Sequence, residues 1–381
     1  MDFDLTEDQV MFKQMVREFA DNEIAPVAEE LDEKGEFPYA LQAKMAEMGL
    51  FGLPIPEEYG GSGADIVTYA VAVEEISRVS ASLGITIAAH TSLSARPILL
   101  FGTEDQKQKW LVPLAQGTGL GAFGLTEPEA GSDAGNTRTT AVLEGDEWVI
   151  NGTKCFITNS GTDISLLVVI TAVTGDEIGK KEISNIIVPN GTLGYTVAPK
   201  YRKMGWQSSD THELSFSDCR VPKENLLGGR GEGFKSFLKA LDCGRIGVAA
   251  LSVGLAQGCL EESVKYAKER IAFGRPISQY QAVSFKCADM AMEIELAHNA
   301  TMKAAWLCDQ GRSYRKEAAF AKLFASETCM RAASNAVQIH GGYGYIEDYP
   351  VCRYFRDAKI MEIGEGTSEV QRIVISRELG L

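Results

Sequence analysis

The sequence of 381 residues predicts an α+β fold in which a middle β domain separates two helical domains. Up to about residue 117, and again from residue 233, apolar residues recur at the spacing of amphipathic helices. In between, short runs rich in β-branched residues alternate with turn residues, as in an antiparallel barrel or sandwich. We therefore expect an N-terminal α-helical domain over 1–117, a middle antiparallel β-barrel domain over 118–228 and a C-terminal α-helical domain resembling a four-helix bundle over 229–381.

The helices of the first domain can be placed from their start and stop signals. Thr6 and Gln9 have the spacing of a capping box, which predicts a helix over 6–33. The segment Asn22–Pro26 is expected to bend or divide this helix, because proline disfavours a helical residue before it. Further helices are expected over 38–48, 65–82, 84–101 and, after a second capping box, 103–117.

Strands are expected in the middle region. Glu147–Ile150 is a β-branched run, and the pair Asn151-Gly152 that follows it predicts a hairpin turn. No helical pattern lies between the runs of this region, so we do not expect the crossovers of a parallel sheet. Further strands are expected over 166–173, 186–188 and 213–216.

Long helices return after Gly233. The first contains Gly247, Gly254 and Gly258 at helical spacing, which permits the close approach of neighbouring helices. Gly311 is expected to end the second helix. The three helices are predicted over 234–271, 280–310 and 314–338.

A glutamate between two glycines stands just before the last predicted helix. Gly364 and Gly366 let the backbone turn sharply, and Ser368 and Gln371 have the spacing of a capping box. Glu365 is then expected to project from a tight turn beside the positive end of a helix, which suits a polarised carbonyl. Taken alone, such a stretch could equally be a solvated glycine-rich loop.

Five further segments carry side chains that could contact a ligand. Gly124–Asp133 could face a polar ligand, and Lys154–Asn159 could stack Phe156 on a flat ring, although a solvated loop and a core phenylalanine are the ordinary alternatives. Asp242 and Arg245 are three residues apart on a helix, so they could anchor a ligand or form a structural ion pair. The remaining candidates are Arg270–Pro276 and Gln338–Tyr345.

Composition argues against several classes of protein. The net charge of −15, from 37 basic and 52 acidic residues, is unsuited to a nucleic-acid groove. The eight cysteines contain no CxxC pair and the four histidines lie far apart, so we expect reduced thiols and no metal. The N-terminus lacks a targeting pattern, and no stretch of about 18 uninterrupted apolar residues occurs. We expect a cytoplasmic protein without a membrane span.

The chain resembles the acyl-CoA dehydrogenase family over essentially its whole length. The resemblance rests on several motifs in the family's order, at 124–133, 156–159, 270–276, 338–345 and 356–372. It is nearest to the short-chain, butyryl-CoA type. It implies FAD-dependent enzymes with a helical, β-barrel and helical layout, usually homotetramers. It also implies α,β-dehydrogenation of an acyl-CoA thioester, with electrons passed to an electron-transfer flavoprotein.

The resemblance implies roles for individual residues. Glu365 matches the base that removes the α-proton while the β-hydride goes to flavin N5. Residues that match FAD contacts are Phe123, Leu125, Thr126, Ser132, Phe156, Ile157, Thr158, Arg270, Phe273, Gln281, Gln338, Ile339, Gly341, Gly342, Thr367 and Glu369. Of these, Arg270, Phe273 and Gln281 match contacts to FAD bound mainly by a neighbouring subunit. Residues that match the substrate site are Thr91, Ser132, Asp242, Cys243, Gly244, Arg245, Gly364 and Gly366.

Gly364 departs from the short-chain pattern, in which tyrosine usually precedes the base. The missing ring should leave room, so a compact branched or cyclic acyl group fits as well as butyryl. Isovaleryl-type relatives carry their base at the position of Gly244, and relatives acting on cyclohexene-carboxyl thioesters carry a carboxylate near 90–92, where this chain has no acidic residue. We therefore expect ordinary α,β-dehydrogenation by Glu365, with cyclohexane- or cyclohexene-carboxyl-CoA as the alternative substrate.

Three other functions share parts of this pattern. An acyl-CoA oxidase would pass its electrons to oxygen. A flavin-containing nucleic-acid-binding relative would need a basic surface, which the net charge of −15 opposes. A catalytically silent CoA-ester binder is opposed by the intact Glu365. The physiological direction is open, since the same site can reduce an enoyl-CoA.

Overall fold

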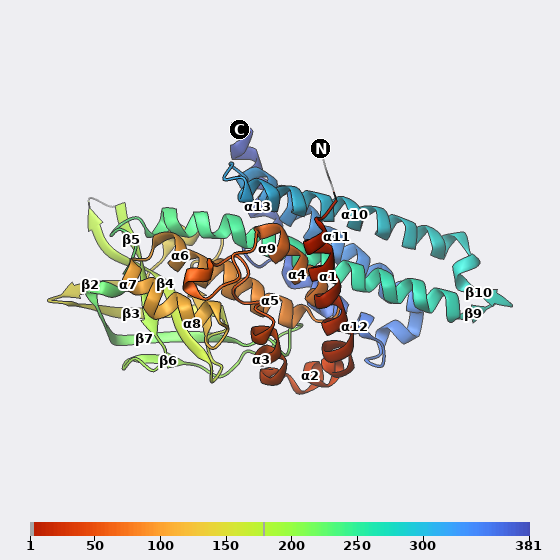
Figure 1. Ribbon diagram of the computed structural model, residues 1–381, viewed down its shortest axis with the longest axis horizontal. Coiled ribbons are helices and arrows are strands. Elements are labelled where there is room, and N and C mark those ends of the chain that lie inside the picture. The colour runs from red at the N-terminus through yellow and green to blue at the C-terminus, as the bar shows by residue number, and fades with distance from the viewer. Residues whose placement is uncertain (1–3, 178–179) are drawn as a thin grey trace.

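The computed structural model describes residues 4–177 and 180–381. Residues 1–3, where the N-terminal prediction begins, lie outside the described residues. Helices are followed by a sheet and then by helices again, in the order predicted (Figure 1). The sheet lies at one end of an elongated molecule, and the connection between the two longest helices lies at the other (Figure 1).

The first helices begin as predicted. Thr6 and Gln9 form the capping box of α1 (Glu7–Phe19), each side chain accepting the backbone N–H of the other residue. The predicted bend is confirmed, since a π-helical turn and a 3-10 turn around Pro26 follow α1. The next elements are η1 (Ala20–Ile24), η2 (Ala25–Val27), α2 (Ala28–Lys34) and α3 (Tyr39–Glu47).

The helix predicted over 84–101 is present, but it contains a π-helical turn. His90 begins this turn: its Nε2 donates to the carbonyl of Leu114 at 3.0 Å, and its Nδ1 accepts the N–H of Gly121 at 3.1 Å. Burial lowers the pKa of His90 to about 4, so the ring is neutral and ties this turn to the backbone at Leu114 and Gly121. The elements are α4 (Ile66–Ser77), α5 (Ala81–Ala89), η4 (His90–Ala95) and α6 (Arg96–Phe101).

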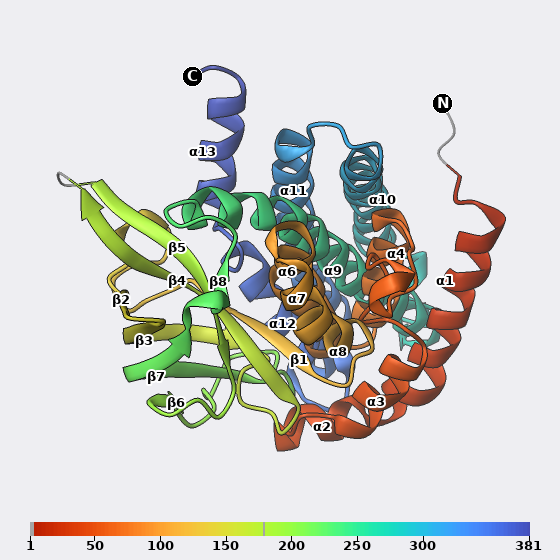
Figure 2. The ribbon, with the colours of Figure 1, turned by 60° about the vertical axis from the view of Figure 1, so that its left-hand side comes forward.

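Short helices continue the chain beside the sheet. Figure 2 shows α6, α7 and α8 between the strands and the long helices. Ile98, Leu111 and Leu114 of these elements pack with Leu167 and Ile187 of the sheet, which joins the two layers in one core cluster. The elements after α6 are α7 (Glu104–Gln106), η5 (Lys107–Leu111) and α8 (Val112–Ala115).

The middle strands form an open sheet rather than the closed antiparallel barrel that the sequence predicts. Within the described residues, the strand order is β6-β7-β3-β2-β4-β5-β8, with β1 beside β4. Both β1 (Leu120–Gly124) and β2 (Thr140–Glu144) pair parallel with β4 (Ser165–Glu177). The sequence did not predict these parallel pairs, because we expected a helix between parallel strands. Here the hairpin of β2 and β3 connects β1 to β4 instead. The other strands are β3 (Glu147–Thr158), β5 (Lys180–Pro189), β6 (Tyr195–Val197), β7 (Thr211–Pro222) and β8 (Leu226–Leu227).

The hairpin turn predicted at Asn151-Gly152 is also wrong. β3 continues through both residues, and the turn between β2 and β3 lies earlier, at 145–146. Gly152 marks a bulge instead, since the register with β7 shifts between Ile150 and Gly152. A Cβ at Gly152 would lie 2.4 Å from Thr139 Oγ1, so glycine is required by close packing inside a strand.

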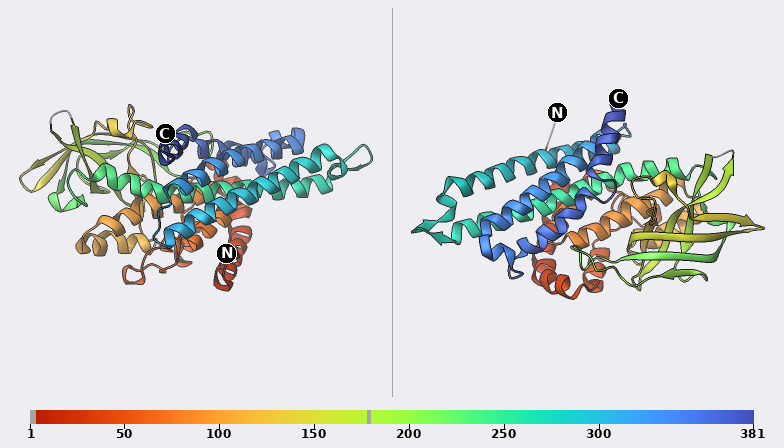
Figure 3. Two further views of the ribbon diagram at one scale, coloured as in Figure 1. Left: turned by 90° about the horizontal axis from the view of Figure 1, so that it is seen from above. Right: turned by 180° about the vertical axis from the view of Figure 1, so that it is seen from behind.

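Three long helices dominate the last part of the chain (Figure 3). Gly311, with φ +62°, follows the second of them, which confirms the predicted stop. The N-terminal helix α4 packs against α9 and α10, and α12 and α13 pack against α11. The elements are α9 (Gly233–Glu269), β9 (Ile271–Ala272), β10 (Arg275–Pro276), α10 (Gln281–Asp309), α11 (Arg315–His340), α12 (Pro350–Ala358) and α13 (Ser368–Glu378).

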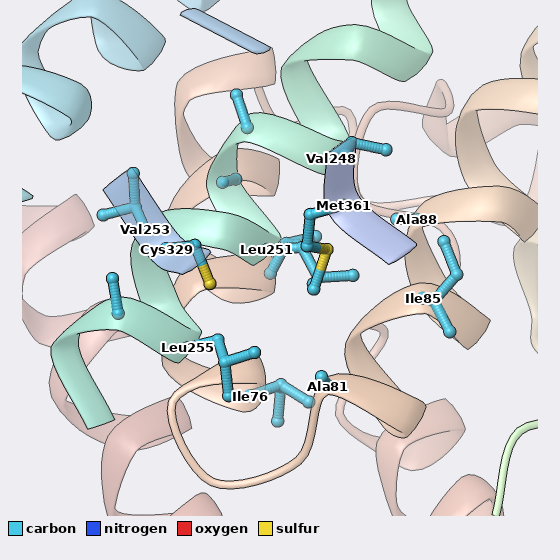
Figure 4. Close-up of a cluster of buried hydrophobic side chains, with 14 of the residues drawn as sticks. Ile76, Ala81, Ile85, Ala88, Val248, Leu251, Val253, Leu255, Cys329 and Met361 are labelled. Atoms are coloured by element: carbon cyan, nitrogen blue, oxygen red, sulfur yellow. The ribbon is translucent and has the colours of Figure 1, made fainter. Parts of the chain in front are cut away.

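Helix α9 is the axis of the main core. Figure 4 shows Val248, Leu251 and Leu255 of α9 among buried side chains from neighbouring helices. Gly254 brings α9 against α4, because a Cβ there would lie 2.1 Å from the carbonyl oxygen of Glu74. Within the described residues, α9 alone has the length and composition of a membrane span, but 89% of that stretch is buried inside the protein, as in a core helix.

Candidate active site

Glu365 lies in a loop between η10 (Lys359–Glu362) and α13. Its φ of +52° is left-handed, a conformation that non-glycine residues adopt rarely and often at functional sites. The N-cap of α13 is Thr367, not the predicted Ser368, since the Thr367 side chain accepts a backbone N–H of the first turn. Gln371 leaves the predicted capping box and donates to the carbonyls of Gly366 and Glu365 at 2.9 and 3.3 Å, which holds the loop in place.

The carboxylate of Glu365 points into the protein. Both of its oxygens are buried, and neither has a hydrogen-bond partner among the described residues. Gly244 of α9 lies against it, because a Cβ at Gly244 would be 1.9 Å from Glu365 Oε2. The same added Cβ would lie 3.2 Å from Leu93 Cδ2 of η4. The carboxylate therefore lies between α9 and η4, in space that any side chain at Gly244 would take.

Burial controls the protonation of this carboxylate. It raises the pKa of Glu365 to about 7, although the positive charges of Lys322 and Arg245 act in the opposite direction. Lys322 of α11 is itself fully buried and donates from Nζ to the carbonyl of Gly366 at 2.7 Å. Arg245 is paired with Asp242 at 2.6 Å. A carboxylate with a pKa near 7 is matched to accept a proton at neutral pH.

Several of the other residues predicted to bind substrate lie on α9, next to Gly244. Asp242 bridges Arg245 and Arg315, with its second oxygen 3.2 Å from Arg315 Nε. Cys243 is buried beside them, and burial raises the pKa of its thiol to about 12. Thr91 of η4 is buried as well. Arg245 and Cys243 are close enough to Glu365 to interact with its charge, whereas the Thr91 hydroxyl donates to the carbonyl of Phe51.

The predicted FAD segments of the middle part lie side by side. The backbone N–H of Cys155 donates to the carbonyl of Thr126 at 2.8 Å, so the loop after β1 runs along β3. Phe156 on β3 has φ +61° and is 66% exposed, which is unusual for a large aromatic ring. The remaining members of this group are Phe123, Leu125, Ser132, Ile157 and Thr158.

Two buried lysines hold the loop after β1 and the Glu365 loop. Neither lysine was predicted to be a site residue. The Nζ of Lys154, whose side chain is fully buried, donates to Glu127 Oε1 at 2.7 Å and to the carbonyl of Leu125 at 3.2 Å. Although burial acts to raise it, the Lys154 charge keeps the pKa of Glu127 below its ordinary value. Lys322 holds the Glu365 loop, by donating to the carbonyl of Gly366. The available signal was a single charged residue in an otherwise apolar stretch.

The remaining predicted FAD contacts divide into two places. Thr367 and Glu369 stand at the start of α13, beside Glu365. Arg270 and Phe273 lie at the opposite end of the molecule from the sheet, around β9 and β10 (Figure 1). There Arg270 lines a cavity of about 500 Å³ together with Ile339, Gly341 and Gly342, next to Gln338, and Gln281 begins α10 nearby. Within one chain, this group is not brought together with Glu365.

Three family models match the chain in the order of its parts. They are the acyl-CoA dehydrogenase N-terminal domain over residues 6–118, the middle domain over 122–219 and the C-terminal domain over 231–380. The chain belongs to the acyl-CoA dehydrogenase family. Like other acyl-CoA dehydrogenases, it is therefore a flavoprotein oxidoreductase that depends on FAD.

Relatives agree over the full length of this acyl-CoA dehydrogenase. It is 57% identical to a probable acyl-CoA dehydrogenase of Bacillus subtilis strain 168, with 100% of both chains covered. It is 49% identical to a short-chain specific acyl-CoA dehydrogenase of Clostridium acetobutylicum, again with 100% of both covered.

Solved structures give the same result. The butyryl-CoA dehydrogenase of Megasphaera elsdenii has a TM-score of 0.97 at 45% identity, with 100% of both chains covered. A chain from work on the electron transferring flavoprotein of Acidaminococcus fermentans has a TM-score of 0.97 at 51% identity, covering 100% of this chain and 99% of that one.

Proposed function

We propose that this enzyme oxidises a short-chain acyl-CoA to the 2-enoyl-CoA, with Glu365 as the base that takes the α-proton. One observation carries the proposal: the Glu365 carboxylate is buried, has no hydrogen-bond partner among the described residues and has its pKa raised to about 7. An unpaired buried charge is unfavourable for folding. Its presence in a family of proton-abstracting enzymes therefore supports a chemical role.

The rest of the loop serves the same step. The α-proton of a thioester is too weakly acidic for an unaided carboxylate, so the carbonyl oxygen needs donors that bind it more strongly as charge develops. We assign the backbone N–H of Glu365 as one such donor. It belongs to the peptide that the left-handed turn orients. Lys322 and Gln371 hold the adjacent carbonyl of Gly366 and so resist rotation of this turn.

The substrate thioester is assigned to the group around Gly244. Asp242 forms ion pairs with both Arg245 and Arg315, which gives a rigid polar edge next to the base. We assign the anchoring of the thioester to this edge, with Cys243, Gly366 and Thr91 completing the contacts. Ser132 is assigned to the CoA portion, since it lies on the loop that runs along β3.

FAD supplies the acceptor for the β-hydrogen and its electron pair. The residues present fit such a group. Phe156 offers an aromatic face that is 66% exposed, and a Cβ added at Gly131 or Gly135 would meet nothing within 4 Å, so the loop beside β3 borders open space. At the far end, Phe273 is 96% exposed next to the cavity at Arg270, which fits a flavin shared with a second subunit.

We further propose that the enzyme is a cytoplasmic homotetramer that passes electrons to an electron-transfer flavoprotein. Helix α10 exposes Phe285, Met292 and Leu296 by 59%, 57% and 53%, and packing between subunits would cover this apolar face. The likeness to the chain studied with the Acidaminococcus flavoprotein supports the choice of electron acceptor. The domain limits 1–117, 118–228 and 229–381 are part of the same proposal.

An alicyclic acyl-CoA is the second candidate substrate. A Cβ added at Gly364 would meet only the carbonyl oxygen of Ile360, at 3.5 Å, so the backbone before the base borders open space. That space could take a branched or cyclic acyl group next to Glu365. The butyryl-type relatives favour a short straight chain, and the open space favours a wider one.

The test is anaerobic bleaching of the flavin by butyryl-, isobutyryl-, hexanoyl- and cyclohexanecarboxyl-CoA. Fast bleaching by butyryl-CoA alone supports a short straight-chain substrate, and bleaching mainly by the branched or cyclic esters supports the second candidate. No bleaching by any ester would refute the proposed dehydrogenation. Fast reoxidation of the reduced flavin in air would instead identify an oxidase.

A further inference from the structure

Two glycines of α9 lie on the face that meets the base. Gly244 and Gly247 are three residues apart, so their side-chain directions lie on one face of the helix, about 5–6 Å apart. Each makes room for a functional group of another element. The carboxylate of Glu365 takes the place of a side chain at Gly244, as described above. At Gly247 an added Cβ would lie 2.6 Å from the hydroxyl oxygen of Tyr69.

Tyr69 reaches this position from α4. Its side chain is fully buried, and its hydroxyl donates to the carbonyl of Ala88 at 3.4 Å. An added Cβ at Gly247 would also lie 3.4 Å from the Ala88 Cβ, so α5 closes the same point from the other side. Figure 4 shows Ala88 on the helix that faces Val248 of α9. Tyr69 and Ala88 have no exposed surface, so α4 and α5 are packed closely against α9 at Gly247.

The surroundings of Gly244 are less tightly closed. Leu93 of η4 approaches Gly244 and is only partly buried, and Glu365 itself is partly exposed through its backbone. An acyl group whose α-carbon meets Glu365 thus enters between η4 and α9. If it continues along α9, it reaches the Tyr69 hydroxyl after about one helical turn. That distance is comparable to the length of a butyryl chain and shorter than a hexanoyl or octanoyl chain.

We propose that Tyr69 is the residue that limits acyl-chain length, by closing the path along α9 one turn beyond the base. The proposal rests on the proposed acyl-CoA dehydrogenation and adds its substrate class. Tyr69 limits the length of the site, whereas Gly364 leaves its width open next to Glu365. The combination selects acyl groups that are short in the direction of α9 and branched or broad near the thioester.

The test compares kcat/KM for butyryl-, isovaleryl-, hexanoyl- and octanoyl-CoA in the FAD-loaded enzyme. Tyr69→Ala and the milder Tyr69→Leu shorten the side chain that closes the path. We expect either to raise the hexanoyl-to-butyryl ratio about tenfold or more, because each methylene accommodated in an apolar site is worth about tenfold. Tyr69→Phe keeps the ring and removes only the hydroxyl, so its ratio should remain within about threefold of the parent enzyme.

Ile76→Ala is the matched control. Ile76 lies on the same helix, is also fully buried and is seven residues, about two helical turns, further along. Its truncation weakens the same core without opening the path, so the chain-length ratio should not change. If Tyr69→Leu folds and leaves the ratio unchanged, or if Ile76→Ala shifts it equally, the proposal is overturned. If none of the thioesters bleaches the flavin of the parent enzyme, it is the proposed dehydrogenation that fails.

Discussion

Replacing Glu365 by glutamine separates the chemical role of this residue from its effect on folding. The substitution keeps the size of the side chain but removes its charge and its ability to accept a proton. In the native protein, the carboxylate is buried without a hydrogen-bond partner among the described residues. We therefore expect opposite effects of Glu365→Gln on turnover and on the free energy of unfolding.

The magnitudes follow from the burial of this carboxylate. A positioned general base contributes about 10² to 10⁴-fold, so the rate of flavin bleaching should fall by that factor. The pKa of Glu365 is raised from 4.5 to about 7, and this difference corresponds to about 3 kcal/mol of lost stability once the carboxylate is ionised. Glutamine still buries a polar amide, so the net gain at pH 8 should be about 1–3 kcal/mol.

The pH dependence has a defined sign. Below pH 4.5 the carboxyl is protonated in both the folded and the unfolded protein, so its ionisation does not affect stability. As the pH rises from 4.5 to about 7, the unfolded chain ionises first and the folded protein loses stability relative to it. The advantage of Glu365→Gln should therefore grow across this range and level off above it. Bleaching by the parent enzyme should rise over the upper part of the same range, as the base ionises.

The assay is urea denaturation of the FAD-loaded parent and variant proteins at pH 5 and pH 8, beside anaerobic bleaching by a fixed thioester. Glu362→Gln provides a control just before the loop, since that glutamate ends η10, forms an ion pair with Lys359 and lies outside the base position. A variant that bleaches at more than a tenth of the parent rate would refute the assignment of Glu365 as the base. Equal stabilisation at both pH values would refute the account of its pKa.

Three other substitutions test the surroundings of the base. Gly244→Ala should slow bleaching by about 100-fold while the protein stays folded, because the new Cβ would lie 1.9 Å from Glu365 Oε2 and displace it. Lys322→Met removes a positive charge near Glu365, so the rise of the bleaching rate with pH should move up by about one unit; an unchanged pH profile would contradict this. Lys154→Met leaves Glu127 buried without its cation, so urea denaturation should show that the free energy of unfolding falls by about 3–5 kcal/mol. Adding Glu127→Gln to this variant should partly restore it.

Local sequence patterns predicted the elements whose signals lie within a few residues of one another. The capping box at Thr6 and the stop at Gly311 are confirmed, because capping bonds and left-handed glycines act over one helical turn. The same patterns failed where a distant contact prevailed. The predicted helix over 84–101 contains a π-turn at His90, whose ring bonds Leu114 and Gly121, and Gly152 serves close packing rather than a hairpin.

By itself, the sequence determined the order of the parts, the family motifs and Glu365 as the candidate base. Only the tertiary structure decided the state of that base, because its burial depends on Gly244, more than a hundred residues away in the chain. The roles of the buried lysines and of the Tyr69 hydroxyl were likewise decided by the tertiary structure. Their roles depend on which groups exclude water from one another, and this depends on helices that are far apart in sequence and meet only after folding.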